Sequence, residues 1–276
     1  MILGIIGYGA IVKQALASLA ATCAGKLDAV VCLARPEGEE RARAMLDAVA
    51  PGARTHVVCT ADALIEHHPG VVAEAAGHEA LITHGAAILG AGRDLIITSV
   101  GALADPRLSG TLDRAAALSG ARYDLCPGAI GGLDILDAAR RSGLTSLLYT
   151  SRKPLEGWRG THAEKLVMLD ELAEPTQFFE GSAREAALLF PQNANVAATI
   201  ALRGLGLDDT RTRLVADPAI TRNIHEISIR SACVDVDMRI VGVPSPDNPK
   251  TSLTTGFALA SKIAAAIEDR ERAPRA

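Results

Sequence analysis

Short, continuously apolar runs alternate with helix-like segments through the first half of the chain, and this alternation constrains the fold more than any other feature. These runs are residues 2–6, 29–33, 56–59, 71–75 and 95–98. They lack the two-residue alternation of a half-exposed strand, so we expect strands that are covered on both faces. The repeated strand–helix order predicts an α/β protein that begins with a doubly wound, parallel, right-handed sheet of the Rossmann type.

The pattern changes near residue 125, where a glycine-rich break over 126–132 precedes a helix-like segment. Apolar and charged residues alternate from 234 to 240, which indicates a strand with one solvated face, and residues 223–230 are expected to form its antiparallel partner. We therefore predict two domains, a Rossmann domain over 1–125 and an α+β domain over 126–251 with an open, mostly antiparallel sheet. A final helix at about 252–268 can return to the first domain.

Charge and composition exclude several classes of function. The 28 Lys and Arg residues are outnumbered by 32 Asp and Glu, and aromatic residues make up only 3%, so nucleic-acid binding is not expected. No apolar run approaches the ~20 residues of a membrane span, and no basic signal sequence is recognised, which favours a cytoplasmic protein. Five cysteines without a C-x-x-C pair favour neither a zinc site nor a disulfide framework, and no metal site is predicted.

A glycine-containing turn follows the first strand. Gly7 and Gly9 are separated by one residue, and Ala10 and Ile11 open the first helix. Such a turn lets the backbone approach a pyrophosphate, which then lies at the helix N-terminus. Val12 replaces the third glycine of the dinucleotide fingerprint, so an ordinary strand-to-helix turn is the alternative. The position of the turn in the βα series favours a dinucleotide.

The residues around the second strand bear on which dinucleotide is used. An NAD site usually has an acidic residue at the end of this strand. Asp28 has the right spacing from the glycines but precedes the strand, whereas Arg35 follows its far end. A guanidinium there can bind the 2′-phosphate of NADP. We predict that NADP is accepted, without excluding NAD; the alternative is that Arg35 is a solvated loop residue.

One histidine differs from the other six in its position. Strand alternation over 223–230 places His225 on the same face as Ile227 and Ile229. A histidine in an apolar setting is most often a hydrogen-bonded core residue. At the mouth of a cleft it would instead serve as a general acid or base near neutral pH.

The carboxyl end of the fourth strand carries a second histidine. His78 follows Ala76 and Gly77 at the edge where open α/β sheets bind their ligands. We expect these three residues to lie near the cofactor, with no chemical role for His78.

Two polar segments are candidates for binding the substrate or cofactor. Asn193 and Asn195 precede and open a helix-like run, where one of them is expected to cap the helix unless its amide binds a ligand. Residues 244–252 form a proline-rich segment that we interpret as a rigid loop. In that loop Lys250 and Thr251 could bind a carboxylate, and an ordinary loop with a helix cap is the alternative.

In this order, these pieces resemble the L-aspartate dehydrogenase family. The matching segments are residues 7–11, 74–79, 127–134, 190–198, 223–227 and 248–252. The glycine turn is generic, whereas Phe190-Pro191-Gln192-Asn193-Ala194-Asn195 and Asn223-Ile224-His225-Glu226-Ile227 are much more specific.

The resemblance implies NAD(P)-dependent oxidative deamination of L-aspartate to iminoaspartate, which hydrolyses to oxaloacetate and ammonium. It implies that the product feeds NAD biosynthesis, that the reverse amination is possible, and that the protein is a homodimer. By matching motif, His225 is the active-site histidine, and Ala129 and Asn195 contact the cofactor. Backbone N–H groups from Gly128 onward are, with Asn193, candidates for the substrate carboxylates.

Two other functions fit the same fold. A reductase related to dihydrodipicolinate reductase would share the architecture, but a basic, His- and Lys-rich substrate segment is not found after the first domain. A redox sensor that binds NADP without turnover would need no base, and His225 on the apolar face of its strand argues against it.

Overall fold

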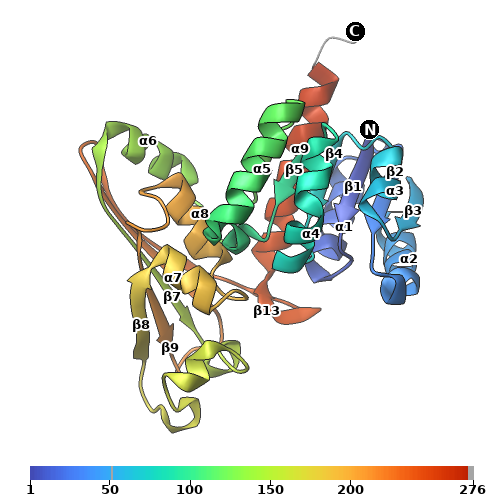
Figure 1. Ribbon diagram of the computed structural model, residues 1–276. Helices are drawn as coiled ribbons and strands as arrows, with labels where there is room; N and C mark the ends of the chain where they lie inside the picture. Colours follow the sequence, from blue (N-terminus) through green and yellow to red (C-terminus); the bar gives the residue numbers. More distant parts are fainter. Residues whose placement is uncertain (51, 273–276) are drawn as a thin grey trace. The chain divides into compact units, whose positions relative to one another are not determined.

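The computed structural model describes residues 1–50 and 52–272, apart from the side chains of Pro249 and Lys250. The chain divides into two compact units, which Figure 1 shows coloured along the sequence. Unit 1 contains Met1–Ser99, Pro106–Gly128 and the chain from Thr255 onward. Unit 2 contains Val100–Asp105 and Ala129–Thr254.

Unit 1 is built on a six-stranded sheet in which every neighbouring pair of strands is parallel. The strand order β3-β2-β1-β4-β5-β6 is that of a Rossmann fold, which confirms the prediction made from the apolar runs. The strands are β1 (Ile2–Ile6), β2 (Ala29–Leu33), β3 (Arg54–Val58), β4 (Val71–Glu74), β5 (Asp94–Ile97) and β6 (Tyr123–Leu125).

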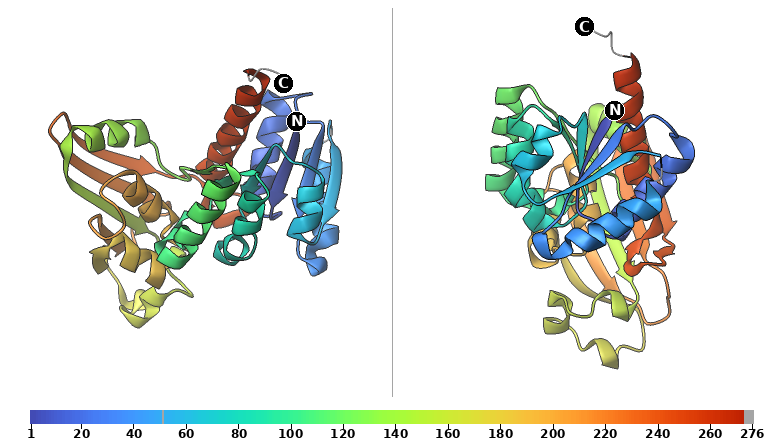
Figure 2. Two further views of the ribbon diagram at one scale, coloured as in Figure 1. Left: turned by 45° about the horizontal axis from the view of Figure 1, so that its top comes forward. Right: turned by 90° about the vertical axis from the view of Figure 1, so that its right-hand side faces the viewer.

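Helices cover both faces of this sheet, as the right-hand view of Figure 2 shows. On one face, apolar side chains of three helices form the core with β1 and β2; these helices are α1 (Ala10–Thr22), α2 (Glu39–Val49) and α9 (Leu253–Arg272). The other face carries α3 (Ala61–Glu66), α4 (His78–Gly90) and α5 (Pro106–Ser119). A short 3₁₀ turn, Pro36–Gly38, precedes α2.

The C-terminal helix α9 packs very closely on α1. A Cβ atom added at Gly256 would lie 2.5 Å from the side chain of Gln14, so glycine is needed at this crossing. Lys26 pairs with Glu271 at 2.8 Å near the end of the same helix. The last helix is therefore part of the dinucleotide-type fold, although it follows unit 2 in the sequence.

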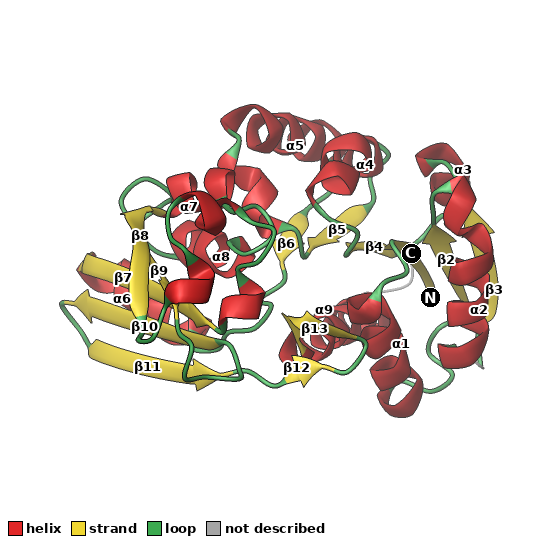
Figure 3. Ribbon diagram, turned by 90° about the horizontal axis from the view of Figure 1, so that it is seen from below, coloured by secondary structure: helices red, strands yellow, loops and turns green. Residues whose placement is uncertain are grey.

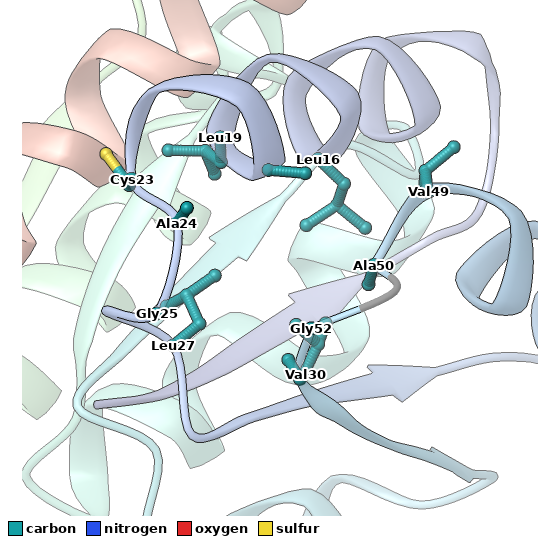
Figure 4. Close-up of a pocket in the computed structure, with 12 residues that line it drawn as sticks. Leu16, Leu19, Cys23, Ala24, Gly25, Leu27, Val30, Val49, Ala50 and Gly52 are labelled. Atoms are coloured by element: carbon teal, nitrogen blue, oxygen red, sulfur yellow. The ribbon is translucent and has the colours of Figure 1, made fainter.

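An apolar pocket of about 240 Å³ lies between the end of α1, the end of α2 and β2 (Figure 4). Leu16, Leu19, Leu27 and Val49 contribute to its lining. Because α1 ends here and β2 begins here, the pocket lies at the opposite edge of the sheet from the turn formed by Gly7 and Gly9. The pocket is therefore separate from the predicted phosphate-binding turn.

Unit 2 contains a five-stranded sheet with the order β11-β10-β7-β9-β8. Three of its four pairings are antiparallel and one, β7 with β9, is parallel, so the sheet is mostly antiparallel, as predicted. The strands are β7 (Leu144–Lys153), β8 (Thr176–Ser182), β9 (Arg211–Ala216), β10 (Ile224–Ser231) and β11 (Asp235–Val241).

One face of this sheet packs against helices, as Figures 1 and 3 show. The helices are α6 (Leu133–Gly143), α7 (Ala183–Leu189) and α8 (Asn195–Arg203), with short 3₁₀ turns at Val100–Ala104, Leu155–Gly157, His162–Lys165 and Leu169–Glu171. Alternate residues of β7 and β10 point to this face and are buried, among them Tyr149 and Ile227. Trp158 anchors a second cluster with Phe190 and Leu214.

The opposite face of the same sheet is charged. Arg152 bonds Asp217 at 3.1 Å, Arg213 bonds Glu180 at 2.9 Å, and Arg230 bonds Asp237 within the β10–β11 hairpin. In the part of the chain that the structure describes, the helices of unit 2 lie on the other face.

The proline-rich segment 244–252 is not the rigid loop that we predicted. It forms a two-stranded hairpin of β12 (Pro244–Ser245) and β13 (Asn248–Ser252). Pro244 is tolerated because it stands at the first position of its strand, where a missing N–H donor costs no central ladder bond. Within the described residues, no helix is long and apolar enough to cross a membrane.

Candidate functional site

The turn after β1 has the backbone form that a pyrophosphate requires. Gly7 has a φ of +105°, and a Cβ atom there would lie 2.9 Å from the Cβ of Ala76, so only glycine fits. Gly9 is the N-cap of α1, and the space that its Cβ would occupy is open. The first helical bond runs from Lys13 N–H to the carbonyl of Gly9, which leaves the amides of Ala10 and Ile11 available to an anion.

A buried carboxylate organises the neighbouring turn after β4. Glu74 is fully buried, and its Oε1 accepts hydrogen bonds from the amides of Ala76 and Gly77 at 2.8 and 3.0 Å. The amide and hydroxyl of Ser99 bond the same carboxylate at 3.0 and 2.8 Å. These four hydrogen bonds to Glu74 hold the carboxyl ends of β4 and β5 together. In the turn that follows β4, Gly77 has a φ of +112°, and His78 is the first residue of α4.

The structure accounts for the acidic residue near β2. Asp28 immediately precedes the strand, and its carboxylate bonds the N-terminal amine of Met1 at 2.8 Å. That bond lowers the pKa of Asp28. Arg35 lies beyond the other end of β2, where its side chain is 76% exposed and pairs with Glu37 at 3.2 Å. Of these two residues, only Arg35 lies at the strand end where a ribose is bound in this fold.

In unit 2, the structure places His225 where the strand alternation indicated. It lies on β10, on the helix-covered face with Ile227, and is only 4% exposed. Its Nδ1 is 2.7 Å from the hydroxyl of Tyr149, and Ser151 is its cross-strand neighbour on β7. Since Nδ1 is held by Tyr149, Nε2 is the ring nitrogen that remains for proton transfer.

The surroundings of His225 keep its imidazole neutral. Burial lowers the pKa of His225 to about 4, and the positive charge of Lys153 acts in the same direction. Burial also raises the pKa of Tyr149, so that the phenol remains protonated near neutral pH. At physiological pH the candidate site therefore holds an uncharged imidazole, oriented by a neutral phenol.

Lys153 is a residue of the candidate site that the sequence patterns did not indicate. It is the last residue of β7, is 6% exposed, and donates a hydrogen bond to Oδ1 of Asn193 at 3.1 Å. Its ammonium also lies 5.1 Å from the ring centre of Trp158. The pattern that could have revealed Lys153 is the alternation of buried and less buried positions along β7, which ends at this lysine. The sequence patterns did not predict a strand at these residues.

The remaining predicted residues have less specific settings. Asn195 does not cap α8: it is the first helical residue, and its Oδ1 accepts from the amide of Gly101 at 2.9 Å. Ala129 is buried, and Gly128 has a φ of +67°. Thr251 lies on β13, and the side chain of Lys250 falls outside the described residues.

Metal-binding chemistry has no obvious site in the described chain. Over residues 1–50 and 52–272, no three His, Cys, Asp or Glu side chains gather in a way that could hold a metal ion. All five cysteines are free thiols, and burial raises the pKa of Cys32 to about 12.

Comparisons with known proteins agree with both units. A family model described as the C-terminal domain of aspartate dehydrogenase matches residues 134–266, and one described as the NAD-binding domain of homoserine dehydrogenase matches residues 7–125. L-aspartate dehydrogenase of Ralstonia pickettii is 43% identical over 92% of this chain and 93% of its own length. The enzyme of the same name from Ruegeria pomeroyi is 40% identical over 95% of this chain and 90% of its own.

A solved structure extends the similarity to three dimensions. The crystal structure of aspartate dehydrogenase from Thermotoga maritima has a TM-score of 0.70 and 26% identity, covering 100% of this chain and 99% of that one. A putative myo-inositol dehydrogenase from Sinorhizobium meliloti, at a TM-score of 0.54 and 15% identity over 100% of this chain and 90% of its own, shares the fold alone. On the sequence identity and the coverage of its curated relatives, the chain belongs to the L-aspartate dehydrogenase family.

Proposed function

We propose that this protein is an NAD(P)-dependent L-aspartate dehydrogenase, which converts L-aspartate and water to oxaloacetate and ammonium by way of iminoaspartate. The observation that carries this proposal is the buried, neutral His225 with its Nδ1 held by Tyr149. It lies within the segment matched by the aspartate dehydrogenase C-terminal model.

The residues of unit 1 fit a dinucleotide. The open space at Gly9 and the available amides of Ala10 and Ile11 suit a pyrophosphate, and Arg35 suits a 2′-phosphate. Ala76, Gly77 and His78 line the next turn, which Glu74 holds in place. When bound, the nicotinamide supplies the hydride acceptor for the reaction. We further propose that Ala129 and Asn195 contact the cofactor.

His225 supplies the proton chemistry. The α-amine of aspartate must be neutral before its carbon loses a hydride, and Nε2 of the uncharged imidazole can take that proton. The same nitrogen can instead activate the water that attacks the imine. In either step Tyr149 keeps the ring oriented, because its hydroxyl stays bonded to Nδ1. The substrate carboxylates need cationic or N–H partners, for which Gly128, Asn193, Lys250 and Thr251 remain candidates.

We assign these tasks to a dinucleotide-binding domain over 1–125 and a substrate domain over 126–251. A contribution to NAD biosynthesis in the cytoplasm is part of the same proposal.

The charged face of the unit 2 sheet suits a homodimer. An open sheet face that is uncovered by helices is a common site of subunit association. Its ion pairs, such as Arg152 with Asp217 and Arg213 with Glu180, would form a polar interface rather than an apolar one. Light scattering on the wild type and on Arg213→Glu tests this: the variant should shift toward monomer, and a monomeric wild type would contradict it.

The test of function is the appearance of reduced nicotinamide with purified protein, L-aspartate, and NAD or NADP in parallel. We expect reduction that depends on L-aspartate and does not occur with D-aspartate, L-glutamate or L-alanine. Binding of the dinucleotide without turnover of L-aspartate would overturn the proposal. It would shift support to a reductase for another substrate, or to a redox sensor.

A further inference from the structure

Lys153 has an unusual position for a lysine. It ends β7 on the helix-covered face of the unit 2 sheet, and only 6% of its surface is exposed. Lysine is among the residues least often buried, because removing an ammonium from water is costly. We therefore expect the ammonium of a buried lysine to contact groups that compensate for its lost hydration.

Lys153 contacts a side-chain amide and an aromatic ring. Its Nζ bonds Oδ1 of Asn193 at 3.1 Å and lies over the ring of Trp158. Because Oδ1 of Asn193 accepts from the ammonium, the amide nitrogen of the same side chain can still donate to another group. That nitrogen is buried, and none of the residues that the structure describes is its hydrogen-bond partner. A cationic donor and an amide donor are thus held next to each other.

This pair of donors lies beside the proposed base. His225 is paired with Ser151 across β10 and β7, and Lys153 is the next residue of β7 on the same face. Diagonal neighbours of this kind are about 7–8 Å apart at Cα, which a lysine side chain spans easily. At this separation the positive charge of Lys153 helps to lower the pKa of His225.

We infer that Lys153 binds a carboxylate of the substrate, with the amide nitrogen of Asn193 as the second donor to it. The inference rests on the proposed function, since it takes His225 to be the base. A carboxylate accepts several hydrogen bonds and attracts a nearby ammonium, so its charge-assisted bonds offset part of the cost of burying it. A substrate anchored in this way has its amine next to His225 on the same face of the sheet.

Binding can be measured without turnover. Succinate carries both carboxylates of aspartate but no amine, and Trp158, the sole tryptophan, lies against Lys153 and reports on its surroundings. We expect succinate to change the tryptophan fluorescence of the wild type, with NAD(P)H present at saturation. Lys153→Met should weaken succinate binding about 10–100-fold, the range for loss of a charge-assisted hydrogen bond. Lys153→Arg should restore part of it.

Lys165→Met is the matched control, because Lys165 is an exposed lysine of the same unit. This variant should bind succinate as the wild type does. Dinucleotide affinity and circular dichroism should be unchanged in all three variants, which shows that they are folded. Unchanged succinate affinity in Lys153→Met would overturn the inference, as would an equal loss of affinity in Lys165→Met.

A titration of the His225 imidazole by NMR separates an electrostatic role from a structural one. Lys153→Met should raise the pKa of His225, because a nearby positive charge is removed. An unaltered titration would contradict the placement of the ammonium next to the base.

Kinetics then identify which carboxylate is bound. In the wild type, L-asparagine retains the α-carboxylate but has an amide in place of the β-carboxylate. If Lys153 holds the β-carboxylate, Lys153→Met should remove the preference for aspartate over asparagine; if it holds the α-carboxylate, KM should rise for both. Succinate binding that depends on Lys153, in a protein that does not oxidise aspartate, would support the inference while refuting the proposed function.

Discussion

The pKa of His225 makes the stability of unit 2 depend on pH in a way that can be calculated. In the unfolded chain the imidazole has its ordinary pKa of 6.5, whereas burial in the folded protein lowers the pKa to about 4. Below pH 6.5 the unfolded state therefore binds a proton that the folded state does not. Well above pH 6.5, His225 is neutral in both states and does not change the free energy of unfolding. As the pH falls from 6.5 toward 4, protonation of His225 in the unfolded state progressively lowers the free energy of unfolding.

The size of the effect follows from the two pKa values. At about pH 5 the imidazole of the unfolded chain is almost fully protonated, whereas that of the folded protein is mostly neutral. The two states therefore differ by about one bound proton over roughly 1.5 pH units, from the unfolded pKa down to about pH 5. At about 1.4 kcal/mol per unit, the free energy of unfolding should fall by about 2 kcal/mol between about pH 7 and pH 5 through this group alone. His225→Gln removes the titrating group, so this contribution should vanish.

Trp158 provides the assay. It is the sole tryptophan, it is fully buried in unit 2, and its Nε1 donates to the carbonyl of Val215 at 3.0 Å. Denaturant unfolding followed by its fluorescence at the two pH values yields the difference between wild type and His225→Gln. His162→Gln controls for removal of an imidazole elsewhere in the unit. Equal pH dependence in wild type and His225→Gln would refute a buried, neutral His225.

Three further substitutions test unit 1. Gly7→Ala places a Cβ atom 2.9 Å from that of Ala76, at a residue with a φ of +105°. The affinity for NADH, measured by the fluorescence of NADH, should therefore fall at least about tenfold. An unchanged Kd would show that the turn does not bind the dinucleotide. Glu74→Gln leaves one acceptor oxygen for four donors, so it should destabilise unit 1 by about 1–3 kcal/mol. Thermal unfolding followed by circular dichroism measures this loss. An unshifted transition would contradict the role of this carboxylate in holding the ends of β4 and β5 together. Arg35→Ala should weaken NADPH binding more than NADH binding in parallel titrations, and equal losses would remove Arg35 from the 2′-phosphate site.

The parallel sheet could be predicted because its central strands are buried on both faces, which leaves an unmistakable apolar run in each. β6 was missed, since Tyr123–Leu125 has only three residues and contains Asp124. β7 was also missed, because Leu144–Lys153 places threonine, serine and arginine between its apolar residues. The prolines of 244–252 predict a loop, whereas the pairing of Pro244 with Ser252 and of Ser245 with Asn248 makes this segment a hairpin.

The candidate site was predictable only where one strand carried the whole signal. The period of two along β10 identified the face of His225 without reference to any other segment. Tyr149 and Lys153 depend on the pairing of β10 with β7, which joins positions far apart in the sequence and leaves no local trace. The carboxylate of Glu74 was likewise visible in the sequence, but its role depends on Ser99 at the end of the adjacent strand.

We propose that His225 serves the chemistry and that unit 1 binds the dinucleotide without it. The most direct test compares wild type with His225→Ala, measuring NADH affinity by fluorescence and the rate of L-aspartate-dependent formation of reduced nicotinamide by absorbance. We predict a turnover lower by about 10²- to 10⁴-fold, the range for loss of a general base, with the Kd for NADH unchanged within about twofold. Turnover that survives the substitution, or NADH affinity that falls as far as turnover does, would contradict this division of roles between the two units.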